Sequence, residues 1–128
     1  MKLLLDTHTL LWFLGGDDRL SRPARDAIED LGNVRLYSVA GAWEMAIKVS
    51  LGKLRLSTAF DDLIPHQLAA NRIALLPVSP EHLSTLVTLP FHHRDPFDRM
   101  FVAQAAVEGA LLVSADAALD AYGIERLW

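Results

Sequence analysis

The sequence predicts an α/β domain built around a mainly parallel sheet of about five strands. Short apolar runs alternate along the chain with longer segments of helical periodicity, which is the pattern of strand–helix–strand units. The runs Lys2–Leu5 (KLLL) and Leu111–Val113 (LLV) are continuously apolar, as expected for central parallel strands covered on both faces. A length of 128 residues fits one domain over residues 1–128.

The other elements follow from their composition and from residues that begin or end a helix. Further strands are predicted at short runs rich in aliphatic or β-branched residues: Val34–Tyr37, Ile73–Val78 and Ile124–Leu127. Helices are predicted from capping residues, prolines and glycines: Ser21 with Pro23 to Gly32, Ser38 to Gly52, Ser79 with Pro80, and Asp95 with Pro96 to Gly109. The segment Ser57–Asn71 also reads as helical, with a kink or a break at Pro65.

Composition excludes several classes of protein. Hydrophobic residues make up 52% of the chain, which supplies a packed core and excludes intrinsic disorder. The longest stretch without Asp, Glu, Lys or Arg is the 12 residues His82–His93, whereas a membrane span needs about 20 apolar residues. Asp6 interrupts the apolar start of the chain, which argues against a secretory signal. The sequence has no cysteine, which agrees with a reducing compartment. We therefore expect a cytoplasmic protein that does not cross a membrane.

The net charge of −4 has the wrong sign for a protein that holds nucleic acid by a general basic surface. A polyanionic substrate would need a local attractor, either a basic patch or a cation on clustered carboxylates. The sequence has no G-x-S-x-G, G-x-x-x-x-G-K-[ST], G-x-G-x-x-G or H-E-x-x-H motif. No two of the five histidines have the spacing of a zinc-binding helical pair, so zinc is not favoured.

Four carboxylates stand at informative positions. Asp6 ends the first predicted strand, Asp98 lies in the first turn of a helix and Asp116 follows the Leu111–Val113 strand. All three therefore fall at the carboxyl edge of the sheet, where open parallel sheets bind ligands. Glu44 lies in an otherwise apolar helical segment, where a buried charge must be paired or coordinated.

Each of these carboxylates also has a purely structural interpretation. Asp6, Asp95 and Asp116 can cap helices, and Glu44 can pair with Lys48 at i+4. Four carboxylates at one edge, however, would repel by about 4 kcal/mol per pair at about 4 Å and an effective dielectric of about 20. A divalent cation removes this repulsion, and oxygen-only ligands favour Mg²⁺ or Mn²⁺. That chemistry suits phosphodiester hydrolysis.

Several motifs together resemble the PIN-domain family, specifically the VapC-like toxins of toxin–antitoxin pairs. The fragments that carry the resemblance span the chain: Leu4–His8 (LLDTH), Trp43–Glu44, His93–Arg99 (HRDPFDR) and Ser114–Asp116 (SAD), with Gly52–Leu54 and Ala103–Ala105 in support. The resemblance implies a three-layer α/β/α domain that binds Mg²⁺ or Mn²⁺ and cleaves RNA endonucleolytically.

Residue by residue, the resemblance matches Asp6, Glu44, Asp98 and Asp116 to the family's first to fourth acids. It also implies supporting roles around them. Three residues would contact the ligands without binding the metal themselves: Thr7, Asp95 and Ser114. Of the two aspartates in the HRDPFDR segment, Asp95 is the better N-cap and Asp98 the ligand.

Arg99 would either touch a substrate phosphate or form a salt bridge that orients Asp95 or Asp98. Three basic residues precede the helix and would either steer RNA toward the pocket or be plain surface residues: His92, His93 and Arg94.

The resemblance also implies partners: a homodimer inhibited by a small antitoxin, with any DNA binding supplied by that antitoxin. Leu10–Leu14 in the first predicted helix (LLWFL) form an apolar stretch that suits either a dimer or antitoxin contact or the core.

Two alternatives remain open at this stage. A catalytically silent binding module would keep the fold and use the carboxylates only as caps. An aspartyl phosphatase or receiver-like domain would use Asp6 as a nucleophile. The second is less well supported, because His8 stands where a phosphatase would carry a second aspartate.

Overall fold

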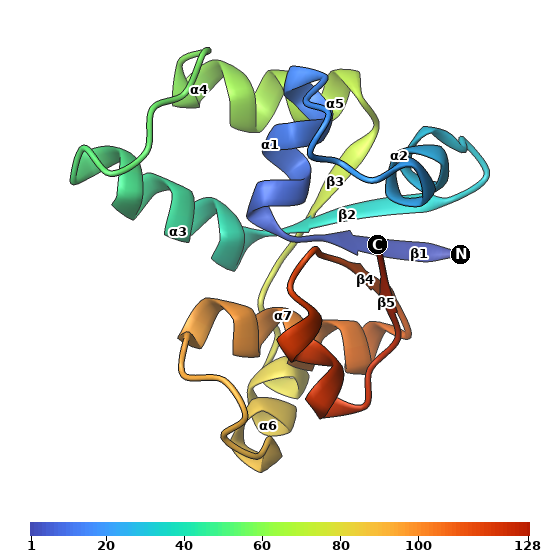
Figure 1. Cartoon of the computed structure of the whole chain (residues 1–128). Coiled ribbons are helices and arrows are strands. Elements are labelled where there is room, and N and C mark those ends of the chain that lie inside the picture. Colours follow the sequence, from blue (N-terminus) through green and yellow to red (C-terminus); the bar gives the residue numbers. More distant parts are fainter.

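The fold is a five-stranded, all-parallel sheet, seen edge-on in a computed structural model that describes residues 1–128 (Figure 1). The order across the sheet is β3-β2-β1-β4-β5, and every neighbouring pair is parallel. The strands are β1 (Lys2–Leu5), β2 (Val34–Ser38), β3 (Ile73–Leu76), β4 (Leu111–Val113) and β5 (Arg126–Leu127). All five predicted strands are confirmed, although β3 ends before Val78 and β5 begins after Ile124.

The order of the strands defines where the sheet can hold a ligand. The chain moves from β1 outward to β2 and β3, and then returns to the other side of β1 to add β4 and β5. The direction of winding therefore reverses between β1 and β4, and crevices for ligands form at such a reversal, beyond the carboxyl ends of the strands. There the backbone N–H of Asp6 donates to the carbonyl of Val113 across 3.2 Å.

Helices cover both faces of the sheet, which confirms the three-layer α/β/α architecture (Figure 1). Leu3 and Leu5 of β1 are buried in one hydrophobic cluster, and Leu4 is buried in the other. Along one face and its edge lie α1 (Thr7–Gly15), α2 (Arg22–Glu29), α3 (Val39–Ser50), α4 (Phe60–Asp62), the π-helix η1 (Leu63–Gln67) and α5 (Leu68–Ala70). Against the opposite face lie α6 (Pro80–Thr88), α7 (Pro96–Glu108) and the 3₁₀-helix η2 (Ala117–Tyr122).

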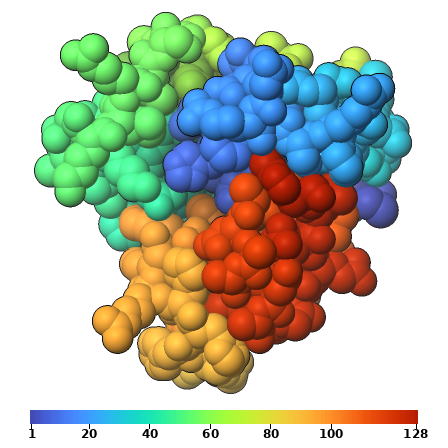
Figure 2. Space-filling model, in the orientation of Figure 1, coloured from blue at the N-terminus to red at the C-terminus, as the bar shows by residue number.

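Figure 2 shows these layers as two halves that meet across the middle of the molecule, blue to green above and orange to red below. Helix α3 begins directly after β2 and contacts both α1 and α7. It therefore brings its side chains to the carboxyl edge of the sheet, where the two halves meet.

The predicted capping residues begin the helices as expected. The side chains of Ser21, Ser38, Ser79 and Asp95 each accept a backbone N–H from the first turn of the following helix. Gly109 follows α7 with a φ of 61°, in the left-handed region that favours glycine. The caps matter for the site because they fix where α3 and α7 start.

The segment around Pro65 is helical and continuous through α4, η1 and α5. The five residues of η1 form a π-turn that includes Pro65. Because proline has no N–H to donate, a widened turn accommodates it without ending the helix. Of the two predicted outcomes, the distorted helix is the one the structure shows.

The apolar stretch in α1 belongs mainly to the interior. Leu10 is fully buried, and Leu11–Leu14 are half-buried against the core. Exposed apolar side chains gather instead between α3, α6 and α7, where Val39, Trp43 and Leu83 line a groove of about 490 Å³. No helix has both the length and the apolar character needed to cross a membrane.

Candidate active site

A cavity of about 200 Å³ opens at the carboxyl edge of the sheet, and all four predicted carboxylates line it: Asp6, Glu44, Asp98 and Asp116. They come from four separate segments of the chain: the end of β1, the middle of α3, the first turn of α7 and the residue before η2. The structure thus brings together residues that are far apart in sequence. Thr7, His8, Lys48 and Asp95 also line this cavity.

Asp6 and Asp116 both cap helices, as their structural interpretation predicts. Asp6 Oδ1 accepts the N–H of Thr9 at 2.8 Å, and Asp116 Oδ1 accepts the N–H of Ala118 at 3.0 Å. The hydroxyl of Ser114 accepts the N–H of Asp116 at 3.1 Å and so fixes the turn that carries this carboxylate. Each capping bond occupies one lone pair of one carboxylate oxygen, so capping and ligand binding are compatible.

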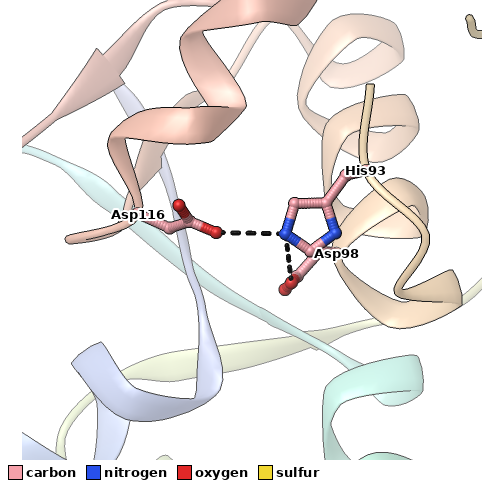
Figure 3. A group of neighbouring side chains, drawn as sticks. All are labelled: His93, Asp98 and Asp116. Carbon is pink, nitrogen blue, oxygen red and sulfur yellow. Dashed lines mark hydrogen bonds and ion pairs between the residues drawn. The ribbon is translucent and has the colours of Figure 1, made fainter. Parts of the chain in front are cut away.

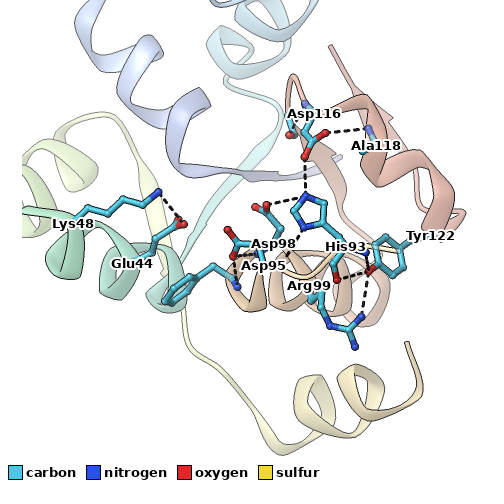
Figure 4. Close-up of polar contacts among 11 residues, drawn as sticks. Glu44, Lys48, His93, Asp95, Asp98, Arg99, Asp116, Ala118 and Tyr122 are labelled. Carbon is cyan, nitrogen blue, oxygen red and sulfur yellow. Dashed lines mark hydrogen bonds and ion pairs between the residues drawn. The ribbon is translucent and has the colours of Figure 1, made fainter. Parts of the chain in front are cut away.

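Glu44 has the partners that its burial requires. Its side chain is 9% exposed, and its Oε2 lies 3.3 Å from Nζ of Lys48, the predicted i+4 pair (Figure 4). On the other side, the hydroxyl of Thr7 donates to Oε1 at 3.2 Å. Thr7 therefore holds Glu44 in place, which is the kind of supporting role expected for it.

Tyr37 completes this arrangement and was not identified from the sequence. Its hydroxyl lies 2.9 Å from that of Thr7. Burial raises the pKa of Tyr37 well above its usual range; the bond to Thr7 opposes this, and the charges of Glu44 and Asp6 add to it. The tyrosine thus stays protonated and donates to Thr7, which in turn donates to Glu44.

Asp98 is a partly buried carboxylate of the cavity with a raised pKa. Burial, followed by the charge of Asp95, raises its pKa to about 7; His93 opposes the rise, and Glu44 and Asp6 add to it. A raised pKa in a cavity lined by other acids is typical of a functional group. The cavity's oxygen donors and their mutual repulsion fit Mg²⁺ or Mn²⁺.

Asp95 is the N-cap of α7, as predicted. Its Oδ1 accepts the N–H groups of Phe97 at 2.8 Å and Asp98 at 3.3 Å (Figure 4). Asp95 also lines the cavity, so it both starts the helix that carries Asp98 and adds negative charge beside it.

His93 is a member of the site that the sequence interpretation treated only as part of a basic loop. Its Nε2 lies 3.2 Å from Oδ2 of Asp116 and 3.5 Å from Oδ2 of Asp98 (Figure 3). One donor atom from each of these three residues lies within 4.8 Å of the others. A search for paired histidines on one helix misses this residue, because its partners are two aspartates on other segments.

Arg99 differs from both of its expected roles. Its guanidinium donates to the carbonyl of Pro90 at 2.7 Å and to the hydroxyl of Tyr122 at 3.2 Å, and it stacks on the ring of Phe91. It forms no salt bridge with Asp95 or Asp98, and it does not line the cavity. Since Arg99 is one residue beyond Asp98 on α7, the helical twist turns it from the cavity toward the preceding loop.

Comparison with solved structures finds the same fold in complexes of bacterial proteins. VapBC2 from Rickettsia felis bound to a DNA fragment from their promoter matches with a TM-score of 0.73 and 15% identity, over 100% of this chain and 98% of that one. VapBC-1 from nontypeable Haemophilus influenzae matches with a TM-score of 0.69 and 15% identity, over 99% of this chain and 97% of that one. FitAcB from Neisseria gonorrhoeae matches with a TM-score of 0.68 and 15% identity, over 98% of this chain and 96% of that one.

Sequence comparison adds a relative and a family. Ribonuclease VapC22 of Mycobacterium tuberculosis (strain ATCC 25618 / H37Rv) is 29% identical over 121 residues, which are 94% of this chain and 91% of that protein. The sequence profile of the PIN domain matches residues 3–125. With nearly the whole chain covered and with the sheet and acidic cavity in place, the chain belongs to the PIN domain family.

Proposed function

We propose that this protein is a divalent-metal-dependent endoribonuclease, the toxin of a toxin–antitoxin pair, which hydrolyses phosphodiester bonds of RNA. The observation that carries the proposal is the convergence of Asp6, Glu44, Asp98 and Asp116, from four chain segments, on one cavity. Similarity to a protein named as a ribonuclease supports the reaction class.

In this proposal Asp6, Asp98 and Asp116 hold Mg²⁺ or Mn²⁺, with Glu44 bound directly or through water. The ion would lower the pKa of a water molecule and would neutralise the charge that develops on the phosphate. The aspartates suit this role because each reaches the cavity from the start of a helix, which fixes the backbone that carries it.

The neighbouring residues of the chain orient the acids and limit their mutual repulsion. Tyr37 and Thr7 fix Glu44 through consecutive hydrogen bonds, and Lys48 balances one negative charge at the cavity. Arg94 is exposed and forms no ion pair, so it remains available to attract a phosphate backbone near α7.

We also propose a protein antitoxin as a partner, with any DNA contact made by that partner. The supporting observation is that the similar solved structures are of VapBC and FitAB proteins, two of them bound to DNA fragments. Co-expression with a candidate antitoxin, followed by co-purification, tests this partner directly.

A homodimer is the third part of the proposal. Because most of the apolar stretch in α1 packs on the core, the exposed groove beside Trp43 is the better surface to mutate. Sedimentation equilibrium of the native chain and of Trp43→Ser would show a dimer that weakens in the variant. A monomer in both cases would contradict a dimer.

The nuclease proposal is tested by incubating purified protein with pooled cellular RNA in Mg²⁺, Mn²⁺ or EDTA. We expect metal-dependent cuts that are lost in Asp6→Asn and Asp98→Asn. Asp61→Asn is the matched control, since Asp61 is exposed on α4 and lies outside the cavity. Absence of cleavage, together with no cation binding by calorimetry, would favour the catalytically silent module.

A further inference from the structure

One histidine lies between two of the proposed metal ligands. From its contacts we infer that His93 is a positioning residue: a proton on its Nε2 orients the carboxylates of Asp116 and Asp98 for the cation. The inference rests on the proposed function, because it assigns a role at the same cation site. It concerns the affinity of the site for Mg²⁺ or Mn²⁺, and it places His93 outside the set of ligands.

The hydrogen bonds of the imidazole ring identify which nitrogen carries the proton. The backbone N–H of Asp95 donates to Nδ1 of His93 at 3.2 Å. A ring nitrogen that accepts a hydrogen bond has no proton, so in the neutral ring the proton lies on Nε2. Nε2 therefore donates to Oδ2 of Asp116 at 3.2 Å, with Oδ2 of Asp98 at 3.5 Å (Figure 3).

This tautomer decides between two roles for the cluster of His93, Asp98 and Asp116. The donor atoms of the three residues are close enough to share one ion. A metal-bound histidine, however, needs a free lone pair on the nitrogen that faces the ion. With its proton on Nε2, His93 presents an N–H to the carboxylates, so the two aspartates are the ligands.

The ring is fixed by residues that lie outside the cavity. The hydroxyl of Tyr122 accepts the backbone N–H of His93 at 2.9 Å (Figure 4). The buried Arg99 donates both to this hydroxyl and to the carbonyl of Pro90 in the same loop. The loop therefore holds the imidazole at one place, and this gives Arg99 the role of a support for His93.

Both oxygens of Asp116 have a fixed donor as a result. Ala118 donates to Oδ1, and His93 donates to Oδ2. Each carboxylate oxygen has two lone pairs, so each still has one available for a cation. Without the ring, Asp116 would keep only the N–H of Ala118 as a fixed donor, and no donor would link its carboxylate to that of Asp98. Loss of such an outer partner weakens metal binding by roughly 10-fold to 100-fold.

The tautomer is measured by nitrogen NMR of uniformly ¹⁵N-labelled protein, without metal and saturated with diamagnetic Mg²⁺. We expect Nδ1 of His93 to resonate as an unprotonated nitrogen and Nε2 as a protonated one in both states. A proton on Nδ1 in the free protein, or loss of the Nε2 proton on addition of Mg²⁺, would make His93 a ligand and overturn the inference.

The effect on affinity is measured by calorimetric titration with Mn²⁺. We expect His93→Ala to weaken binding by about 10-fold or more, and His93→Gln, whose amide N–H can reach the carboxylates, to recover part of that loss. His66→Ala is the control, because His66 is exposed on η1, pairs with Asp62 and does not line the cavity. Unchanged Mn²⁺ affinity in His93→Ala would contradict the assignment.

These measurements separate the inference from the nuclease proposal. If His93→Ala does not fold, His93→Gln and the NMR spectrum of the native chain still decide the matter. If Mn²⁺ binds, the tautomer is as expected and RNA is not cut, the nuclease proposal fails while the role of His93 stands.

Discussion

The two ends of helix α7 each place a carboxylate beside a histidine, and the two pairs behave in opposite ways. At the end of the helix, Glu108 lies 2.8 Å from Nε2 of the buried His82 and 3.6 Å from Lys2, and these partners lower its pKa. At the start, Oδ2 of Asp98 lies 3.5 Å from Nε2 of His93, and burial, followed by the charge of Asp95, raises the pKa of Asp98 to about 7.

The difference between the ends separates a structural ion pair from a binding site. Lys2 and His82 compensate the charge of Glu108 within the fold, so this carboxylate needs no ligand to be stable. Asp98 is partly buried beside other carboxylates, so its ionised form is disfavoured unless a cation lies close to it. Helix α7 thus carries Glu108, whose contacts stabilise the fold, and Asp98, whose surroundings suit a ligand-binding group.

The sharpest test of this contrast is to neutralise each carboxylate in turn. We expect Asp98→Asn to reduce metal-dependent RNA cleavage by at least about 100-fold, and to leave the melting temperature equal or higher, since a repelled charge is removed. Glu108→Gln should lower the melting temperature and preserve cleavage. Paired cleavage and calorimetric unfolding assays check both, and loss of stability in Asp98→Asn would contradict the distinction.

Removing the histidine at the structural end should cost more stability than any other change at that end. His82 is 1% exposed, and its Nδ1 accepts the N–H of Ser79 while its backbone N–H donates to the Ser79 hydroxyl. We expect His82→Ala to lower the free energy of unfolding by about 3 kcal/mol, because a cap, the hydrogen bond to Glu108 and packing are lost together. Urea denaturation measures this, and cleavage by the folded fraction should not change.

The two ends should also respond oppositely to pH. Because the folded pKa of Asp98 is raised from 3.8 to about 7, the folded protein holds a proton there that the unfolded chain has released. Stability without metal should therefore fall as pH rises across that window. Glu108 acts in reverse: its lowered pKa gives stability that is present above 4.5 and lost as pH falls through the folded value.

Thermal unfolding in EDTA, repeated across this pH range, measures both effects. Asp98→Asn should remove the fall toward pH 7, and Mg²⁺ should suppress it in the native chain. A fall that persists in Asp98→Asn would assign it to a different group.

The smallest effect is expected at Lys2, the outer member of the structural pair. Its side chain is 48% exposed and its Nζ lies 3.6 Å from Glu108. We expect Lys2→Ala to change the free energy of unfolding by no more than about 0.5 kcal/mol, since exposed pairs contribute little. A larger loss by urea denaturation would show that Lys2, and not His82, balances Glu108.

Much of this fold is predictable because its signals are local. The runs Lys2–Leu5 and Leu111–Val113 mark buried parallel strands, and the caps Ser38 and Asp95 place α3 and α7. Asp6, Asp98 and Asp116 follow from the same signals, since strand ends and helix starts of a parallel sheet share one edge. Glu44 follows from its place as a lone carboxylate in an apolar helix.

The rest of the site depends on contacts between distant segments. Tyr37 meets Thr7 across 30 positions of sequence, and His93 meets Asp116 across 23. Neither residue has a local pattern that indicates such a contact. Arg99 stands beside an acid in sequence but turns away from it in space, because adjacent residues of a helix point in different directions.

The reversal of winding between β1 and β4 has a consequence for the synthesis of the chain. Asp6 is made early, but Asp116, which lines the same cavity, follows 110 positions later. During translation β1 cannot pair with β4 until β4 has been synthesised. The cavity therefore forms late, because it depends on this long-range pairing. A nascent chain therefore carries Asp6, Glu44 and Asp98 without the fourth acid, and the acidic cavity is completed only when β4 and η2 have left the ribosome.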